Sequence, residues 1–198
     1  MAKRLAYIIS RILGPLTLVC LIWLVTAFKS GIGFWKAVWV YPLIFILSIA
    51  IPFGITTYLI LTKRVDNLDW KKLEDRNRYF PIALGALGIL VILTYFLTNS
   101  TIFHLTLVLA VIILATIFCY LFLRFKISAH MVLASITFAA INLFYHLQFL
   151  WLYLLLIPLA WARYTLKVHT LIELVAGLIL ANGIILAALL IFGWPNVP

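Results

Sequence analysis

The stretch IFHLTLVLAVIILATIFCYLFL, residues 102–123, decides the fold, because it contains no aspartate, glutamate, lysine or arginine. A helix needs about 20 consecutive apolar residues to cross the hydrocarbon core of a bilayer. A segment in that environment must also satisfy its own backbone hydrogen bonds, which a helix does without a partner. Residues 102–123 therefore predict a membrane-spanning helix.

Further apolar segments flank this one, three on each side. The seven predicted spans cover about residues 5–28, 38–62, 81–98, 102–123, 127–146, 148–163 and 170–192. The third and sixth are short, and Pro158 is expected to kink the sixth. We therefore predict an all-α fold, a polytopic transmembrane helical bundle of six to seven spans. It forms one integral membrane domain over residues 1–198.

The composition points to lipid as the solvent for most of the chain. Hydrophobic residues make up 67% and charged residues 10%, whereas a soluble domain is about half apolar and about a quarter charged. Cys20 and Cys119 lie inside apolar runs and are interpreted as buried hydrophobic residues. The apolar run at the N-terminus is too long for a signal peptide, so we expect it to be retained as the first helix.

Lysine and arginine are distributed unevenly between the two sides of the predicted bundle. Because consecutive spans alternate sides, the N-terminus, the 63–80 loop and the junctions at 124–130 and 163–169 share one face. Basic residues accumulate on the cytoplasmic side of membrane proteins, so this motif face is predicted to be cytoplasmic. Topology then accounts for the net charge of +10 without nucleic acid binding. The other face has only two basic residues, Lys29 and Lys36. The motif face has thirteen: Lys3, Arg4, Arg11, Lys63, Arg64, Lys71, Lys72, Arg76, Arg78, Arg124, Lys126, Arg163 and Lys167.

Charged residues also gather in ARYTLKVHTLIELVAG, residues 162–177, between the last two predicted spans. His169 and Glu173 are four residues apart at the start of a helix, so one helix face carries both. A carboxylate that accepts a hydrogen bond from an imidazole fixes its tautomer and stabilises the charged ring. Arg163 ends the preceding span, where its planar guanidinium could bind a phosphate.

Two other polar clusters are expected on the same face. In RFKISAH, residues 124–130, Ser128 and His130 stand near a helix start with Lys126 beside them, a combination suited to an anion. The stretch DNLDWKKLEDRNRYFP supplies further positive charge from Lys71, Lys72, Arg76 and Arg78.

These residues resemble the type 2 phosphatidic acid phosphatase superfamily of membrane lipid phosphatases, whose motifs read K-x6-R-P, P-S-G-H and S-R-x5-H-x3-D. The stretch ARYTLKVHTLIE matches the third motif as A-R-x5-H-x3-E, with Ala162 in place of serine and Glu173 in place of aspartate. The stretch ISAH keeps the serine and histidine of the second motif, with Ile127 for proline and Ala129 for glycine.

The first motif is matched by spacing. Lys71 and Arg78 have the K-x6-R separation, and the proline follows three residues later, at Pro81; Lys72 or Arg76 could hold the equivalent roles instead. The resemblance thus covers a catalytic-motif region over residues 71–177, with the three motifs in the family's order.

The resemblance implies a membrane phosphatase or phosphotransferase that acts on a lipid phosphate or a polyprenyl diphosphate. It implies that His169 attacks phosphorus and forms a phosphohistidine, that Glu173 orients it, and that His130 protonates the leaving oxygen. No metal or other cofactor is implied, because basic side chains replace a metal ion. The residues implied to hold the phosphoryl oxygens are Lys71, Arg78, Ser128 and Arg163.

Two other interpretations stay open. Asp66, Asp69 and Asp75 could hold magnesium on a diphosphate, as in an intramembrane prenyltransferase. A non-enzymatic transporter or membrane interaction protein could instead bind anionic lipid headgroups with the basic junctions. His104 and His146 lie near the opposite face without charged neighbours and are interpreted as structural.

Overall fold

All regular elements in the described part of the chain are helical, which confirms the all-α prediction. The computed structural model describes residues 1–29, 31–64 and 73–193, and of residues 73–80, 82 and 83 the backbone alone. In chain order the elements are α1 (Ala2–Ile12), α2 (Pro15–Lys29), α3 (Phe34–Phe45), the π-helix η1 (Ile46–Ala50), α4 (Ile51–Leu61), α5 (Leu73–Leu97), α6 (Ser100–Leu121), α7 (Ala129–Phe144), the 3-10 helix η2 (Leu150–Leu155), α8 (Leu156–Thr165) and α9 (Leu171–Phe192).

The helices have the lengths and composition of a multi-pass membrane protein. Four stretches in the described chain are long and apolar enough to cross a bilayer: Ala2–Lys29, Phe34–Leu61, Ser100–Leu121 and Leu171–Phe192. Three shorter apolar helices accompany them: Leu84–Leu97, Ala129–Phe144 and Leu150–Thr165. These stretches coincide with the seven predicted apolar segments, and Leu84–Leu97 is part of the 25-residue helix α5.

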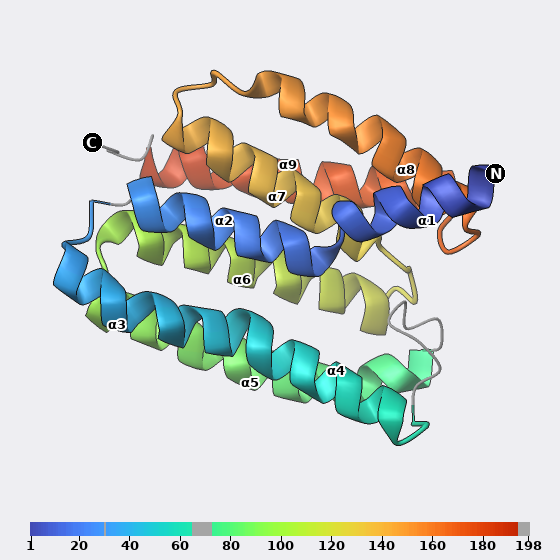
Figure 1. Ribbon diagram of the computed structural model, residues 1–198, viewed down its shortest axis with the longest axis horizontal. Helices are drawn as coiled ribbons and strands as arrows, with labels where there is room; N and C mark the ends of the chain where they lie inside the picture. Colours follow the sequence, from blue (N-terminus) through green and yellow to red (C-terminus); the bar gives the residue numbers. More distant parts are fainter. Residues whose placement is uncertain (30, 65–72, 194–198) are drawn as a thin grey trace.

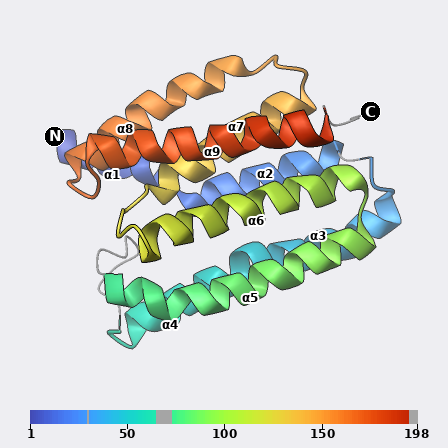
Figure 2. The ribbon, with the colours of Figure 1, turned by 180° about the vertical axis from the view of Figure 1, so that it is seen from behind.

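The helices lie side by side in an elongated bundle (Figure 1). Helix α7 packs against α2 and α9, α1 packs against α8, and α5 packs against α6. Seen from behind, α6 lies between α5 and α9 (Figure 2). One end of the bundle holds the first residues of α1, α5, α7 and α9 together with the last residues of α4, α6 and α8. We call this the motif end, because the predicted motifs map to it.

Helix α7 is the most enclosed element. Twelve of its sixteen residues are buried, and its side chains join those of α2, α6 and α9 in the apolar core. Large apolar side chains elsewhere point outward, among them Phe28, Trp39 and Ile172. A surface of this kind suits a hydrocarbon solvent, because burial of apolar groups from water no longer dictates which way they face.

Buried hydroxyl groups find partners within their own helices. The side chains of Thr26 and Thr106 are fully buried, and their hydroxyls donate to the carbonyls of Ile22 at 2.6 Å and Ile102 at 2.8 Å. An unpaired polar group is costly in an apolar medium, so this local bond lets threonine sit inside the bundle.

Three element boundaries differ from the predictions. The first predicted span is two helices, because the helix is interrupted at Leu13 and Gly14. The backbone is tightly turned there, since a Cβ on Gly14 would lie 2.9 Å from the Arg11 carbonyl oxygen. Helix α5 begins at Leu73, eight residues before the predicted start, and holds Pro81 inside it. The predicted kink at Pro158 is absent, because a 3-10 helix ends at Leu155 and α8 begins at Leu156. Pro158 therefore lies in the first turn of α8, where its missing N–H breaks no helical hydrogen bond.

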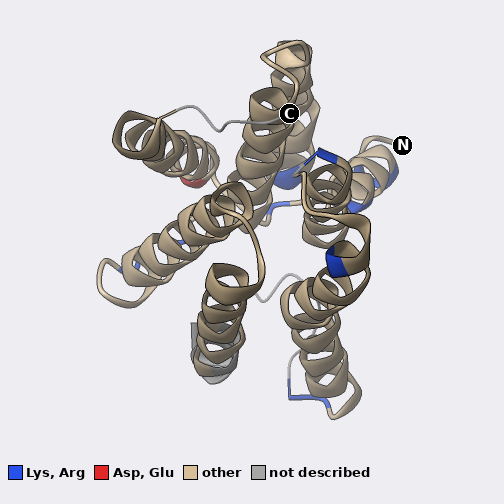
Figure 3. Cartoon of the chain, turned by 90° about the vertical axis from the view of Figure 1, so that its left-hand side faces the viewer, with Lys and Arg blue, Asp and Glu red and all other residues tan. Residues whose placement is uncertain are grey.

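Charged residues lie near the helix ends, and most of the chain carries no charge (Figure 3). Lys63 and Arg64 follow α4, Arg124 and Lys126 follow α6, and α1 holds three more at the motif end. Lys29 ends α2 and Lys36 begins α3 at the other end. The described residues therefore keep the predicted asymmetry between the two ends.

Gly177 and Gly183 lie on the same helix, α9, and provide a matched test of this packing. A Cβ at Gly177 would lie 3.1 Å from the Ser128 carbonyl oxygen and 3.3 Å from the Met131 Cβ, whereas one at Gly183 meets nothing within 4 Å. Gly177→Ala is expected to lower the thermal midpoint in detergent, because overpacking costs about 1–3 kcal/mol against a gain in helix propensity of about 1 kcal/mol.

Gly183→Ala should leave the midpoint unchanged or raise it, because only the helix-propensity gain applies there. The close packing of α9 on α7 would be refuted by a Gly177→Ala protein that melts as high as the Gly183→Ala protein.

Candidate active site

The second and third predicted motifs meet where α7 and α9 begin. The Ser128 backbone N–H donates to the Glu173 carbonyl oxygen at 3.3 Å. Lys126 reaches across the same junction, and its Nζ donates to the Val168 carbonyl oxygen at 2.9 Å. Gly177 lets the two backbones approach this closely, since its missing side chain leaves room for the Ser128 carbonyl. The structure therefore joins two regions that are distant in sequence.

His169 and Glu173 form the pair that their spacing predicts. The His169 Nδ1 lies 3.0 Å from the Glu173 Oε2. An ionised carboxylate can only accept, so the proton of the hydrogen bond belongs to Nδ1, which leaves the Nε2 lone pair unprotonated. The imidazole is almost enclosed, with 4% of the side chain exposed against 19% for Glu173. The geometry thus fixes one tautomer of a buried histidine.

Glu173 also caps helix α9. The Thr170 N–H donates to the same Oε2 at 3.0 Å, and the Glu173 N–H donates to the Thr170 Oγ1 at 3.3 Å. This reciprocal capping box satisfies two backbone N–H groups that the first turn of a helix leaves unpaired. One carboxylate oxygen therefore serves both the helix start and the histidine.

His169 lies in the junction before α9, outside the apolar helices, and its surroundings favour the neutral ring. The pKa of His169 is lowered from 6.5 to about 4, mainly by burial and further by the positive charges of Lys126 and Arg163. The hydrogen bond that His169 donates to Glu173, and the charge of that carboxylate, raise the pKa without cancelling these effects. At neutral pH the imidazole is therefore uncharged, which is the form that can act as a nucleophile.

Ser128 and His130 stand at the start of α7. Ser128 is the N-cap residue but makes no side-chain cap bond. Its side chain is fully buried, and its Oγ has no hydrogen-bond partner among the described residues. His130 lies on the first turn of α7 and is half-buried. A buried hydroxyl in this state is ready to donate to an oxygen placed beside it.

Arg163 lies inside the last turn of α8 and turns into the bundle. The residue is 3% exposed, and its guanidinium nitrogen donates to the Ser10 Oγ at 2.8 Å. This bond ties α8 to α1, where Ser10 is also buried. Arg163 is thus held firmly, and its charge still lowers the pKa of His169.

Of the Lys71 and Arg78 pair of the first predicted motif, the structure describes only the backbone of Arg78. Lys71 is outside the described residues, as are Asp66 and Asp69 of the alternative magnesium site. Arg78 and Asp75 lie on α5, which packs against α6 and α4, whereas α9 packs against α6, α7 and α8. Within the described residues no group of three or more histidine, cysteine, aspartate or glutamate side chains is placed to hold a metal ion.

Lys126, expected beside Ser128 and His130, lies at the junction and donates to the Val168 carbonyl. Two residues of the site were not predicted: Ser10 binds Arg163, and Thr170 completes the capping box. The run TLIE, residues 170–173, has the T-x-x-E pattern of a capping box, so the sequence contained a signal for Thr170. The role of Ser10 depends on how α1 packs on α8 and has no local sequence signal.

His104 and His146 lie at the end opposite the motifs, as predicted. The His104 ring stacks on Phe192 with 4.4 Å between ring centroids, and His146 is exposed in the turn after α7. Neither contributes to the cluster around His169.

Comparisons with models of protein families, with curated proteins and with solved structures found no match to this chain. The resemblance to the phosphatidic acid phosphatases therefore rests on the motif residues alone. What the site does is argued below from its geometry and chemistry.

Proposed function

We propose that the protein is a membrane phosphatase or phosphotransferase that acts on a lipid phosphate or polyprenyl diphosphate through a phosphohistidine at His169. The observation that carries the proposal is the neutral His169 ring, whose Nδ1 faces the Glu173 carboxylate at 3.0 Å. A histidine held in this tautomer presents Nε2 as a nucleophile, and a carboxylate behind it stabilises the charge that develops.

The proposed reaction has two steps. First, the His169 Nε2 attacks phosphorus, the bond from phosphorus to the lipid oxygen breaks, and His130 gives a proton to that leaving oxygen. The leaving product is a lipid alcohol from a lipid phosphate, or the polyprenyl monophosphate from a polyprenyl diphosphate, and the phosphoryl group stays on Nε2. In the second step His130 takes a proton from water, whose oxygen attacks phosphorus, and the phosphohistidine bond breaks to release phosphate and neutral His169. A lipid alcohol in place of water gives phosphotransfer.

Glu173 has a positioning role in this scheme. While phosphorus is bonded to Nε2 the ring carries positive charge, and the carboxylate beside Nδ1–H offsets it. The same charge opposes the burial that lowers the pKa of His169. Glutamate in place of the family's aspartate suits this position, because the longer side chain also reaches back to the Thr170 N–H.

Positive groups and donors around His169 would stabilise the phosphoryl oxygens. Lys126 and Arg163 are close enough to lower the pKa of His169, and the Ser128 hydroxyl is buried without a partner in the described structure. These groups would offset the negative charge of the transition state without a metal ion. Lys71 and Arg78 of the first motif are proposed to join them from α5 and the segment before it.

The membrane setting fits an amphiphilic substrate. The site lies at the motif end of a bundle whose outer surface is apolar, so a lipid could keep its chains in the bilayer while its phosphate meets His169. We place this end on the cytoplasmic side, because the basic residues concentrate there.

A non-enzymatic membrane protein is the second candidate, and two observations favour it. The capping box accounts for Glu173 without any chemistry, and the His169 side chain is only 4% exposed. In that case Lys126 and Arg163 would bind anionic headgroups or only brace the helix junction.

Phosphate release separates these candidates. The purified protein in detergent with EDTA should release phosphate from phosphatidate or from a polyprenyl diphosphate. His169→Ala should lower kcat by about 1,000-fold or more, since the nucleophile is lost. His146→Ala is the matched control, because His146 is exposed at the opposite end, and it should retain full activity. Equal phosphate release by wild type and His169→Ala would exclude the mechanism.

A pair of substitutions at Glu173 separates capping from positioning. Gln is also accepted in a capping box, so Glu173→Gln should keep the thermal midpoint while kcat falls about 10-fold or more through loss of the charge beside Nδ1. Glu173→Asp keeps the charge and shortens the reach, so it should cost about 0.5–1 kcal/mol of stability. If Glu173→Gln matches wild type in both kcat and thermal midpoint, Glu173 only caps the helix.

A further inference from the structure

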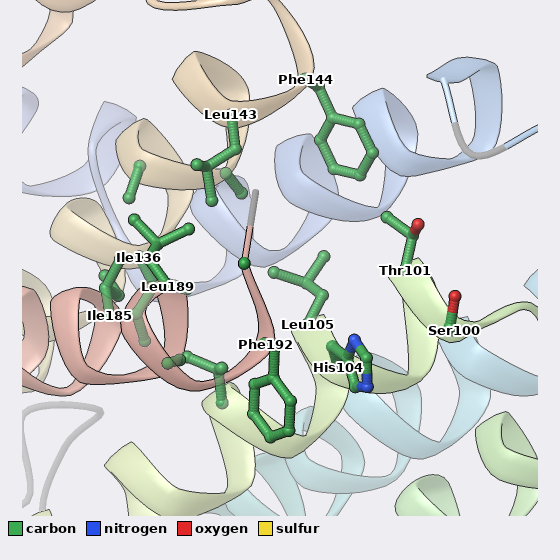
Figure 4. A pocket seen from close by; sticks show the side chains of 15 residues that line it. Ser100, Thr101, His104, Leu105, Ile136, Leu143, Phe144, Ile185, Leu189 and Phe192 are labelled. Atoms are coloured by element: carbon green, nitrogen blue, oxygen red, sulfur yellow. The ribbon is translucent and has the colours of Figure 1, made fainter. Parts of the chain in front are cut away.

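A cavity of about 160 Å³ lies at the end of the bundle opposite His169. Three helices form its walls: α6 from Ser100 to Val108, α7 from Ile136 to Phe144, and the last turns of α9. Figure 4 shows aliphatic side chains of α7 and α9 on one side, including Ile136 and Leu189. The hydroxyls of Ser100 and Thr101 lie on the other side, and His104 and Phe192 lie together between them.

A second, more polar hollow adjoins this cavity and shares Ser100 and His104 with it. Its remaining lining consists of Tyr95, Thr98, Asn99 and Phe103, at the turn between α5 and α6. The two hollows thus form one site with an apolar lobe between helices and a polar lobe at the helix ends. The boundary between them is the His104 ring, stacked on Phe192.

The chemistry of the polar lobe selects an uncharged group. Its described lining includes hydroxyls, an amide and an imidazole, and no lysine or arginine. The Thr98 hydroxyl donates to the Thr94 carbonyl and the Asn99 Oδ1 accepts from the Ile102 N–H, so these two groups belong to the helix ends. A phosphate there would lose its water without gaining a cationic partner, which is unfavourable. A hydroxyl or an ester carbonyl would be satisfied by the hydroxyls of Ser100 and Thr101 and the ring of His104, which line the cavity.

The apolar lobe selects a narrow hydrocarbon segment. An apolar cavity of about 150 Å³ holds one benzene-sized molecule, so the volume suits about six carbons of a chain. From Ser100 to Val108 the wall extends about 12 Å at 1.5 Å per residue, which suits a chain lying along the helices.

We propose that this end of the bundle binds a single-chain lipid with an uncharged, hydroxyl-bearing head, of the monoacylglycerol class. The head lies against Ser100, Thr101 and His104, and the first carbons of the chain enter between α6, α7 and α9. The site is remote from His169 and does not depend on the proposed phosphatase activity.

Photolabelling tests the proposal directly. The probe is a monoacylglycerol with a diazirine near the head end of its acyl chain, added to the protein in phosphatidylcholine vesicles. Ala188 lines the cavity on α9, whereas its neighbour Ala187 is exposed on the same helix. Ala188→Leu and Ala187→Leu therefore add the same side chain, one inside the cavity and one outside.

We expect labels on residues 101–108 and 136–144 in wild type. Ala188→Leu should lower them about 10-fold, corresponding to about 1.4 kcal/mol of lost binding, and Ala187→Leu should leave them unchanged. Excess unlabelled monoacylglycerol should compete, and excess lysophosphatidate should not. If Ala188→Leu lowers the thermal midpoint, Ala139→Val fills the cavity from α7 instead. Labelling that is equal in the filled and control variants, or that lysophosphatidate suppresses equally well, overturns the proposal.

Discussion

The carboxylate of Glu173 accepts hydrogen bonds from two donors, and both helix α9 and the candidate site depend on it. Its Oε2 receives the Thr170 N–H and faces the His169 Nδ1, each at 3.0 Å. The bond from the Thr170 N–H caps the start of α9. The bond from the His169 Nδ1 fixes the orientation of the imidazole just before that start. Because both bonds use one atom, the orientation of the imidazole is coupled to the start of the helix.

The apolar medium explains why polar groups concentrate where they do. Inside the bundle, threonine hydroxyls donate hydrogen bonds to carbonyls of their own helix, because an apolar medium supplies no water as an acceptor. Groups that need other partners lie in the junctions, where Lys126 and Ser128 meet the start of α9. The two ends then differ in character. The motif end concentrates positive charge around a buried histidine, and the far end lines a cavity with neutral donors and acceptors.

Sequence reasoning succeeded where a feature is local and failed where it depends on packing. Long apolar runs identify the helices, and the four-residue spacing identifies the pairing of His169 with Glu173. The helical start of α5 at Leu73 was missed, because its first residues are polar and Pro81 follows them. The contact of Arg163 with Ser10, 153 residues away, was not predictable, since it arises from the packing of α1 on α8. The T-x-x-E pattern at Thr170 was a readable signal that the prediction did not use.

The most direct test of the central claim is to trap the covalent intermediate. Wild-type protein is mixed with phosphatidate that carries radioactive phosphorus, quenched within the first turnovers in alkali and digested, and the labelled peptide is sequenced. The account predicts a label that is stable in alkali and labile in acid, as a phosphoramidate is, on the peptide that contains His169. Phosphate release without any label on His169, or a label carried by another residue, would contradict it.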